Sequence, residues 1–385
     1  MPLLPRWNYE QFLTRFMSTG QNLAHPGRFG LTELRPSLIG TLFSGSLDIV
    51  GDIHGEIDAL RDLMRVLGYT ADGVHPGGRR LVFVGDLSDR GPDSPAVLEL
   101  VSGLVSLGLA QCILGNHELN LLRQEHKEGN GWYFDTNHDH AENKFLDSRP
   151  LDSGKRPALR DFLAGLPIAL ERDDLRLVHA AWHPASIVEL RSSHFSALEL
   201  FNNHHASAER LGEVTGLKQR SDAEKASVGE AFKRRAAPVR FLPAVAAYDA
   251  LMQDSNPISI ATSGIERMAT TAFYAGGKWR MVNRYPWWQD YQDDVPVIVG
   301  HYWRWPTASS RAAFSKGDPD LFAGLQSNEC FGAKKNVFCV DFSVGARYLE
   351  RQAGVIDHFE CRLGAVSWPE RELVLDDGTR TALAW

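Results

Sequence analysis

The chain has 385 residues, of which 43% are hydrophobic and 23% are charged, and its formal net charge at pH 7 is −7. This length and composition are typical of a globular protein that can build a full core. The negative charge argues against a broad surface for general nucleic-acid binding, and the lack of any run of about 18 apolar residues predicts no membrane span.

Short apolar runs recur along the chain after a mixed, proline-interrupted start, for which we expect a leader helix within residues 1–45. Runs that are this short and rich in Val and Ile predict strands buried on both faces. They are LDIV (47–50), LVFV (81–84), CIL (112–114), LRLV (175–178), VIV (297–299) and VFCV (337–340).

Helical patterns lie between these runs. Leu60, Leu63 and Leu67 follow the three- and four-residue spacing of an amphipathic helix. Ser94 followed by Pro95 predicts an N-cap and the first helical position of a second helix. Strand, helix and strand in repetition predict a layered α/β domain.

Two stretches interrupt this pattern. Residues 122–155 are polar and rich in Gly and Asn, which predicts a long surface loop or a small insertion. Residues 190–236 are rich in Ala, Glu and Lys with weak helical periodicity, which predicts an inserted helical cap.

Each predicted strand is followed by polar residues that can bind a metal or take part in catalysis. In open α/β sheets, ligand sites form beyond the carboxyl ends of the strands, so we expect these side chains to converge. In strand order they are Asp52 and His54; Asp86, Asp89 and Arg90; Asn116, His117 and Glu118; His179; and His301.

The ligand types in this set point to metal chemistry. Carboxylate, imidazole and amide groups suit Mn, Fe or Zn better than a soft thiolate site would. Six such ligands are too many for one tetrahedral ion, but they suit two ions that share a bridging carboxylate. Two ions about 3.5–4 Å apart can hold a phosphoryl group and activate a water between them.

The motifs that carry these residues resemble those of a known family. GDIHG (51–55), GDLSDRG (85–91) and GNHE (115–118) are similar to the three signature motifs of the phosphoprotein phosphatase (PPP) family of calcineurin-like metallophosphoesterases. Three later segments are also similar to that family, its bacterial members included: VHAAW (178–182), VGHYW (299–303) and FCVDFSVG (338–345). The resemblance therefore covers most of the chain and indicates a bacterial-type member.

The resemblance implies a fold of two mixed β-sheets flanked by helices, with an inserted helical cap. We expect one metallophosphoesterase domain over residues 1–385, with a core at about 45–345. Within it we place the helical insertion at about 185–240 and the C-terminal strands at 337–385.

The resemblance also implies which residues hold two divalent metal ions, with Mn expected first and Fe or Zn as alternatives. Asp52 and His54 would hold the first ion, and Asp86 would bridge both. The implied ligands of the second ion are Asn116, His179 and His301.

The remaining roles are those of acid and phosphate-binding groups. The resemblance implies that His117 is the general acid, that Asp89 orients it, and that Arg90 binds phosphate oxygens. We expect Asn116 to contact the substrate as well.

A second phosphate-binding arginine is expected in eukaryotic members, and the motifs do not fix its position here. Arg304, three residues after His301, is the candidate that we adopt. Arg267 and Arg284 are the other candidates.

The expected reaction is hydrolysis of a phosphomonoester by direct attack of a metal-bound water, with no covalent phosphoenzyme. The first substrate hypothesis is a phosphoserine or phosphothreonine protein, with small phosphorylated compounds also accepted. The alternative is a nucleotide such as a dinucleoside polyphosphate cleaved at an anhydride. A metal-dependent binding protein with little turnover is a third possibility, which the intact His117, Asp89 and Arg90 argue against.

Two further patterns remain open. The aromatic segments YPWWQDYQ (285–292) and HYWRW (301–305) favour core packing, although Trp287, Trp288 or Trp303 could stack on a substrate. The cysteines Cys112, Cys330, Cys339 and Cys361 form no CxxC pair, which indicates reduced, buried thiols. Because no signal peptide is evident either, we expect a cytoplasmic protein with no membrane partner.

Overall fold

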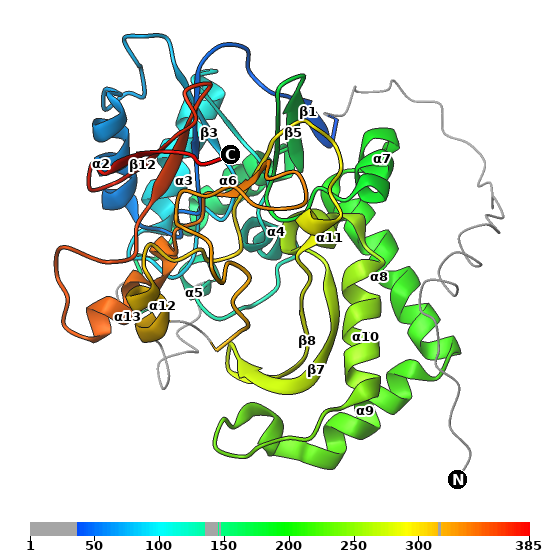
Figure 1. Ribbon diagram of the computed structural model, residues 1–385. Coiled ribbons are helices and arrows are strands. Elements are labelled where there is room, and N and C mark those ends of the chain that lie inside the picture. The colour runs from blue at the N-terminus through cyan, green and yellow to red at the C-terminus, as the bar shows by residue number, and fades with distance from the viewer. Residues whose placement is uncertain (1–36, 135–144, 146–147, 315–316) are drawn as a thin grey trace. The chain divides into compact units, whose positions relative to one another are not determined.

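The computed structural model describes residues 37–134, 145, 148–314 and 317–385 (Figure 1). The chain divides into two compact units, Met1–Arg35 and Pro36–Trp385, and all described residues lie in the second. The expected leader helix falls almost entirely outside the described residues, and the end of that segment forms strand β1 instead.

Two mixed sheets form the centre of the described unit. One has the order β1-β5-β6-β9-β10, and the other has the order β13-β12-β11-β2-β3-β4. The strands of the first are β1 (Ile39–Thr41), β5 (Ala169–Arg172), β6 (Leu175–Val178), β9 (Val297–Val299) and β10 (Val337–Cys339). Those of the second are β13 (Arg380–Ala382), β12 (Glu372–Leu375), β11 (Gly364–Trp368), β2 (Leu47–Val50), β3 (Arg80–Phe83) and β4 (Ala110–Cys112).

Each sheet contains three neighbouring parallel strands. In the second sheet, β2 pairs with β3 and β3 with β4, so that Phe83 is opposite both Val50 and Cys112. In the first, β6 pairs with β9 and β9 with β10, and Val299 is opposite Cys339. The carboxyl ends of each trio therefore lie along one edge of their sheet.

The two sheets face each other across a buried apolar cluster. Leu47 and Val82 of the second sheet and Leu177, Ile298 and Phe338 of the first belong to this cluster, and each is at most 1% exposed. Burying one such side chain contributes about 1.5–3 kcal/mol, so the cluster fixes the sheets against each other. The expectation of two mixed sheets flanked by helices is confirmed.

Helices cover the outer faces of the sheets and form the insertion. They are α2 (Ile57–Leu67), α3 (Ser94–Ser106), α4 (Asn116–Leu122), α5 (Gly131–Phe134), α6 (Arg156–Ala164), α7 (Pro184–Ser192), α8 (Ala197–Val214), α9 (Leu217–Val228), α10 (Pro243–Asp254), α11 (Pro257–Ser263), α12 (Ala308–Phe314) and α13 (Arg347–Gln352). Short 3₁₀ turns are η2 (Ser153–Lys155), η3 (Gly229–Lys233), η4 (Trp287–Gln289) and η5 (Val344–Ala346).

The apolar runs locate the central strands well. The runs at 47–50, 175–178 and 297–299 coincide with β2, β6 and β9. The run at 112–114 lies too far toward the C-terminus, because β4 spans Ala110–Cys112. The predicted N-cap is also wrong by one residue: Asp93 caps α3 by accepting a hydrogen bond from the backbone N–H of Ala96, and Ser94 is the first helical residue.

The polar stretch 122–155 is more structured than a surface loop. Its residues 131–134 form α5, in which Trp132 is 4% and Tyr133 is 1% exposed. Residues 135–144 and 146–147 lie outside the described part.

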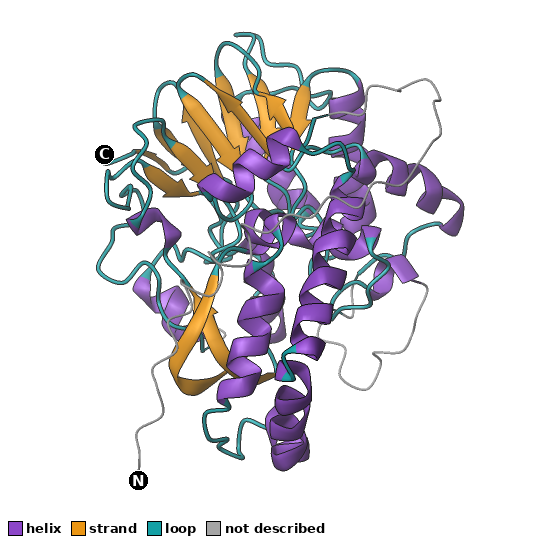
Figure 2. Cartoon of the chain, turned by 90° about the vertical axis from the view of Figure 1, so that its right-hand side faces the viewer, coloured by secondary structure: helices purple, strands orange, loops and turns teal. Residues whose placement is uncertain are grey.

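The insertion at 185–240 is helical and continues beyond its expected end. We refer to α8, α9 and α10 as the cap helices, and to β7 (Glu266–Ala275) with β8 (Lys278–Arg284) as the hairpin. Figures 1 and 2 show the cap helices and the hairpin side by side, below the two sheets. Helix α10 packs on both strands of the hairpin.

Two composition-based expectations can be checked directly. The four cysteines are free and buried, as predicted. Among the described residues, no helix is both long and apolar enough to cross a membrane.

Candidate metal centre

The strand ends bring two groups of potential metal ligands together. His54, Asp86 and His117 form one group, and Asp86, His179 and His301 form the other; within each group the ligand atoms lie within 4.8 Å of one another. All of these residues are buried, and Asp86 belongs to both groups. We call these five residues, together with Asp52 and Asn116, the strand-end cluster.

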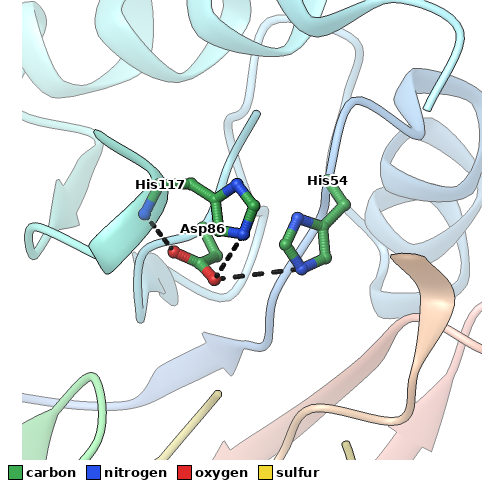
Figure 3. Close-up of side chains that lie close together, drawn as sticks. All are labelled: His54, Asp86 and His117. Carbon is green, nitrogen blue, oxygen red and sulfur yellow. Dashed lines mark hydrogen bonds and ion pairs between the residues drawn. The ribbon is translucent and has the colours of Figure 1, made fainter. Parts of the chain in front are cut away.

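Asp86 is the centre of this arrangement. Its Oδ2 lies 3.9 Å from His54 Nε2 and 3.8 Å from His117 Nε2, and its Oδ1 lies 3.3 Å from His179 Nε2. Its Oδ1 also accepts a hydrogen bond of 3.0 Å from the backbone N–H of His117 (Figure 3). One carboxylate therefore faces imidazole nitrogens on both sides, as a bridging ligand requires.

Backbone carbonyls set the orientation of two histidine rings. His54 Nδ1 lies 3.0 Å from the carbonyl oxygen of Ser88, and His179 Nδ1 lies 2.7 Å from that of Val84. A carbonyl can only accept, so both Nδ1 atoms carry a proton and each Nε2 atom faces Asp86. Burial and then the charge of Arg90 lower the pKa of His54 well below its ordinary value, which favours the neutral form that binds metals.

His301 and Asn116 complete the second group. His301 Nδ1 lies 2.9 Å from Asn116 Oδ1, and His179 Nε2 lies 3.3 Å from the same oxygen. The Nε2 atom of His301 is buried and has no hydrogen-bond partner in the described structure. His301 therefore turns its Nδ1 toward the amide oxygen, and an imidazole nitrogen beside an amide oxygen and a buried carboxylate fits a metal ligand.

Asp52 lies next to this group. Its carboxylate accepts the backbone N–H of His301 at 3.1–3.2 Å, and its Oδ2 is 3.9 Å from His54 Nε2. Behind it lies Asp341, which accepts the backbone N–H groups of Trp303 and Ser343 at 2.8 and 2.9 Å.

The charges in the cluster are unbalanced without a cation. Burial and then Asp341 raise the pKa of Asp52 well above its ordinary value. Burial also raises the pKa of Asp86, but His179 and His117 outweigh it and hold that pKa well below normal. Burial lowers the pKa of His179, whereas Asp86 and Asp52 raise it to about 10. These pKa shifts show that the buried carboxylates need nearby positive charge, which a divalent cation would supply.

His117 has a partner set that differs from those of the other histidines. Its Nδ1 lies 2.5 Å from Asp89 Oδ2, and the indole N–H of Trp132 donates to Asp89 Oδ1 at 2.7 Å. Asp89 and Trp132 are at most 4% exposed. Trp132 thus fixes the carboxylate that orients His117, and sequence reasoning missed it because α5 lies in the polar stretch 122–155.

Arg90 bridges two of the imidazoles. Its guanidinium donates from Nη1 to His54 Nε2 at 2.7 Å and from Nη2 to His117 Nε2 at 3.0 Å. It also lies over the ring of Trp303, 4.7 Å from the centroid. The planar fork is thereby held at the mouth of the cluster, in reach of any anion that binds there.

The loops of the cluster are held in conformations that most residues avoid. Among the described non-glycine residues, His54, Asp86, Asp89, Arg90, His301 and Trp303 all have positive φ, between 48° and 73°. Such residues cost about 1–3 kcal/mol each and persist only where the surroundings enforce them.

Buried contacts supply that enforcement. The carboxylate of Glu118 accepts the backbone N–H groups of Asp86, Leu87 and Ser88 at 2.8–3.3 Å. A Cβ atom on Gly115 would lie 2.4 Å from Asp86 Oδ1, so this position requires glycine.

The three candidate arginines lie in different places. Arg304 is 2% exposed, and its Nη2 donates to the carbonyl oxygens of Gln326 and Glu329, so the structure does not bring it to the cluster. Arg267 pairs with Asp254. Arg284, the end of β8, lines a cavity together with Asn116 and His301, and after burial it is the largest cause of the lowered pKa of His301.

The three candidate tryptophans also lie in different surroundings. Trp287 and Trp288 are 3% and 2% exposed and pack in the main core, which is the packing role predicted for them. Trp303 instead lies beside Arg90 and, at 6.4 Å between ring centroids, beside His54.

Comparison with known proteins agrees with this geometry. Residues 46–212 match the family model of calcineurin-like phosphoesterases. The asymmetrical bis(5'-nucleosyl)-tetraphosphatase PrpE of Geobacillus thermodenitrificans is 46% identical over 80 residues, which are 20% of this chain and 33% of that one. The protein of the same name from Bacillus subtilis is 46% identical over 79 residues, 20% of this chain and 32% of that one.

The chain thus spans about a third of the length of the curated relatives it matches. Among solved structures, the cold-active protein-tyrosine phosphatase of a Shewanella species aligns with a TM-score of 0.42 and 15% identity, covering 94% of this chain and 89% of that one. At these values the structural likeness carries no argument about function. The family match and the resemblance of the motifs agree: residues 46–212 of this chain match the calcineurin-like phosphoesterase family.

Proposed function

We propose that this chain is a metal-dependent phosphoric ester hydrolase that holds two divalent ions, with Mn expected first and Fe or Zn as alternatives. The observation that carries the proposal is that Asp86 is shared by two buried groups of ligands. As ligands we propose Asp52, His54 and Asp86 for one ion, and Asp86, Asn116, His179 and His301 for the other. Such ions, when bound, polarise phosphoryl oxygens and lower the pKa of a water.

The residues around the ions would complete the reaction. His117 would protonate the leaving oxygen, because its Nε2 faces the cluster while Asp89 holds Nδ1 at 2.5 Å. Asp89 is a positioning residue here, and Trp132 supports it. Water would form the new bond to phosphorus as the bond to the leaving oxygen breaks, so no covalent phosphoenzyme would form.

Two arginines would hold the phosphate. Arg90 already lies between His54 and His117. For the second arginine we replace Arg304 by Arg284, because Arg284 lines the same cavity as His301 and has no hydrogen bond or ion pair with a described residue. Its guanidinium lies 5.7 Å over the ring of Tyr302, which leaves its N–H groups available.

The first substrate hypothesis is a phosphoserine or phosphothreonine protein, for which the single metal-bound phosphate would be the main contact. The second is a nucleoside or dinucleoside polyphosphate, in line with the printed name of the curated relatives. A specific observation favours the second: the cavity beside the cluster carries an excess of cations. The four free, buried thiols support a reducing compartment such as the cytoplasm.

A substrate panel tests this proposal. Phosphopeptides, diadenosine tetraphosphate and p-nitrophenyl phosphate are incubated with Mn-loaded protein, with chelator-treated protein as the control. Turnover that requires the metal supports the proposal, and the ranking of kcat/KM chooses the substrate class. Full metal occupancy without turnover of any of the three would instead indicate a binding protein.

A further inference from the structure

A cavity of about 550 Å³ extends away from the strand-end cluster. Asn116 and His301 line one end of it, and Phe201 of α8, Asp249 of α10 and Lys278 of β8 line the rest. Its walls therefore include α4, α8, α10, α11 and the hairpin. Its volume lies within the usual range for small-molecule sites, about 300–1,000 Å³.

Cations outnumber carboxylates along these walls, although the whole chain is negatively charged. The lining cations are Arg123, Lys127, Lys278, Arg280 and Arg284, and the lining carboxylates are Glu125, Asp249 and Glu266. A local positive excess of this kind concentrates anions against the net charge of the protein.

Most of these charges are already paired. Glu125 contacts both Arg123 and Lys127, and Arg280 lies 2.9 Å from Glu266. Asp249 lies 3.9 Å from Lys225, a residue that does not line the cavity.

Two of the cations that line the cavity are not paired in this way. Within the described part of the chain, the side chains of Lys278 and Arg284 have no hydrogen-bond or ion-pair partner. They are the groups whose charge is available to a ligand.

The strand places these two cations at different distances from the cluster. Lys278, Arg280 and Arg284 occupy alternate positions of β8, so they share a face of the hairpin. Arg284 lies at the end near His301, and Lys278 is six residues away along the curved strand, at most about 20 Å at about 3.3 Å per residue. An anion bound at the cluster can reach Arg284, whereas Lys278 can only meet a group further along the ligand.

A second, smaller cavity adjoins the same arginines. It has a volume of about 220 Å³, shares Arg280 and Arg284, and is lined by Phe273, Trp303 and Trp305. Aromatic walls next to phosphate-binding cations suit a ligand that carries an aromatic ring as well as phosphates.

We propose that the cavity along β8 is a second anion subsite, which binds phosphate groups of the substrate other than the one hydrolysed, with Lys278 as its distal contact. The ligand class is a small molecule with a chain of phosphates. The inference rests on the proposed function, because it assumes that the scissile phosphate lies at the strand-end cluster.

The test is a binding experiment that does not depend on turnover. His117→Asn protein, with Mn in excess over nucleotide, is titrated in a calorimeter with a non-hydrolysable, methylene-bridged analogue of diadenosine tetraphosphate and with AMP. Lys278→Met is then added to this background, with Lys233→Met as the matched control, because Lys233 is an exposed lysine of η3 outside the cavity lining.

We expect Lys278→Met to weaken tetraphosphate binding about 5- to 20-fold, which is the range of a charge-assisted contact reduced by solvent screening. AMP binding should change by less than about twofold, because its single phosphate would lie at the strand-end cluster and would not reach Lys278. Lys233→Met should change neither. Lys278→Glu should extend the loss in the same direction.

Equal losses for both nucleotides, no loss for either, or a His117→Asn protein that binds both nucleotides equally would overturn the subsite. Hydrolysis of p-nitrophenyl phosphate by wild-type protein is measured separately. Absent turnover with selective loss at Lys278 rejects the hydrolase proposal and keeps the subsite, whereas turnover without selective loss does the reverse.

Discussion

The strand-end cluster differs in its construction from the cap helices and the hairpin, which we together call the cap region. In the cluster, buried side chains follow short strands and are held by backbone groups, as Glu118 holds three successive N–H groups of the Asp86 loop. In the cap helices and the hairpin, α9 buries Ser221 alone, and β7 buries only Ala269 and Ala275. We therefore expect the proposed chemistry to depend on the core, and the proposed choice of substrate to depend on the cap helices and the hairpin.

This difference predicts how each region responds to substitution. A change in the cluster removes a group that several others contact, so losses should be large and should couple with one another. A change in the cap region removes one solvent-exposed contact, so losses should be small and should depend on the ligand.

The largest expected effect is that of Asp86→Asn. Because this carboxylate faces both groups of ligands, the substitution should reduce metal occupancy at both positions. Loss of several kcal/mol of charge stabilisation should lower kcat/KM by about 10³-fold or more. Elemental analysis and p-nitrophenyl phosphate turnover check this, with the exposed Asp161→Asn as control. Two retained ions with normal turnover would show that the core does not fix the chemistry through Asp86.

The next effect separates acid catalysis from metal binding. His117→Asn should slow hydrolysis of an alkyl phosphate such as phosphoserine by about 10²–10⁴-fold, because an alkoxide needs a proton in the transition state. The loss with p-nitrophenyl phosphate should be clearly smaller, since nitrophenolate leaves without a proton. Metal content should not change, and the exposed His126→Asn is the control.

Two other outcomes would change this assignment. Equal losses with both substrates would mean that His117 positions phosphate or water. Loss of metal would make His117 a ligand, which its place beside His54 and Asp86 allows.

A smaller loss of activity is expected for Trp132, which contacts His117 only through Asp89. Trp132→Phe removes the N–H that holds Asp89, and groups at this remove from a metal site commonly cost about 10-fold in activity. The loss should appear in kcat for phosphoserine and should vanish in a His117→Asn background. Trp279→Phe, which removes an indole donor to the carbonyl of Arg234 in the hairpin region, is the control. A loss that persists without His117 would give Trp132 a purely structural role.

The smallest effect concerns the stability of the cap helices. His204 of α8 lies 2.6 Å from Glu189 Oε1 and 2.9 Å from the carbonyl of Ser255, and the hydrogen bond with Glu189 raises its pKa against the opposing effect of burial. A raised folded pKa means that the stabilisation is complete below the unfolded pKa of about 6.5 and is lost as pH rises through the folded value.

The destabilisation caused by His204→Gln should therefore be larger at pH 5.5 than at pH 8.5, within about 0.2–1 kcal/mol as for an exposed pair. Urea unfolding at both pH values measures it. His205→Gln, whose ring lies 3.9 Å from Glu209, serves as the control. A larger loss at high pH would contradict the sign.

The same contrast explains what the sequence could predict. The runs LDIV, LRLV and VIV mark β2, β6 and β9, because a doubly buried strand is a local pattern. The residues of the strand-end cluster are equally readable, since each follows its strand within a few positions.

The remaining features depend on packing between distant segments. Nothing near Trp132 in the sequence indicates that its indole lies 2.7 Å from Asp89, 43 residues away. The sequence could not decide between Arg284 and Arg304 as the second phosphate-binding arginine for the same reason. Only the fold of the hairpin places Arg284 at the cavity, and only the loop at 326–329 buries Arg304.

The most direct test of the central claim is a count of metal ions. Wild-type protein is purified with Mn, passed through a desalting column and analysed for metal and protein in the same sample. Two ions per chain are expected, because Asp86 faces two buried groups of ligands. One ion or none under Mn-replete conditions would contradict the shared-carboxylate centre on which the proposed hydrolysis depends.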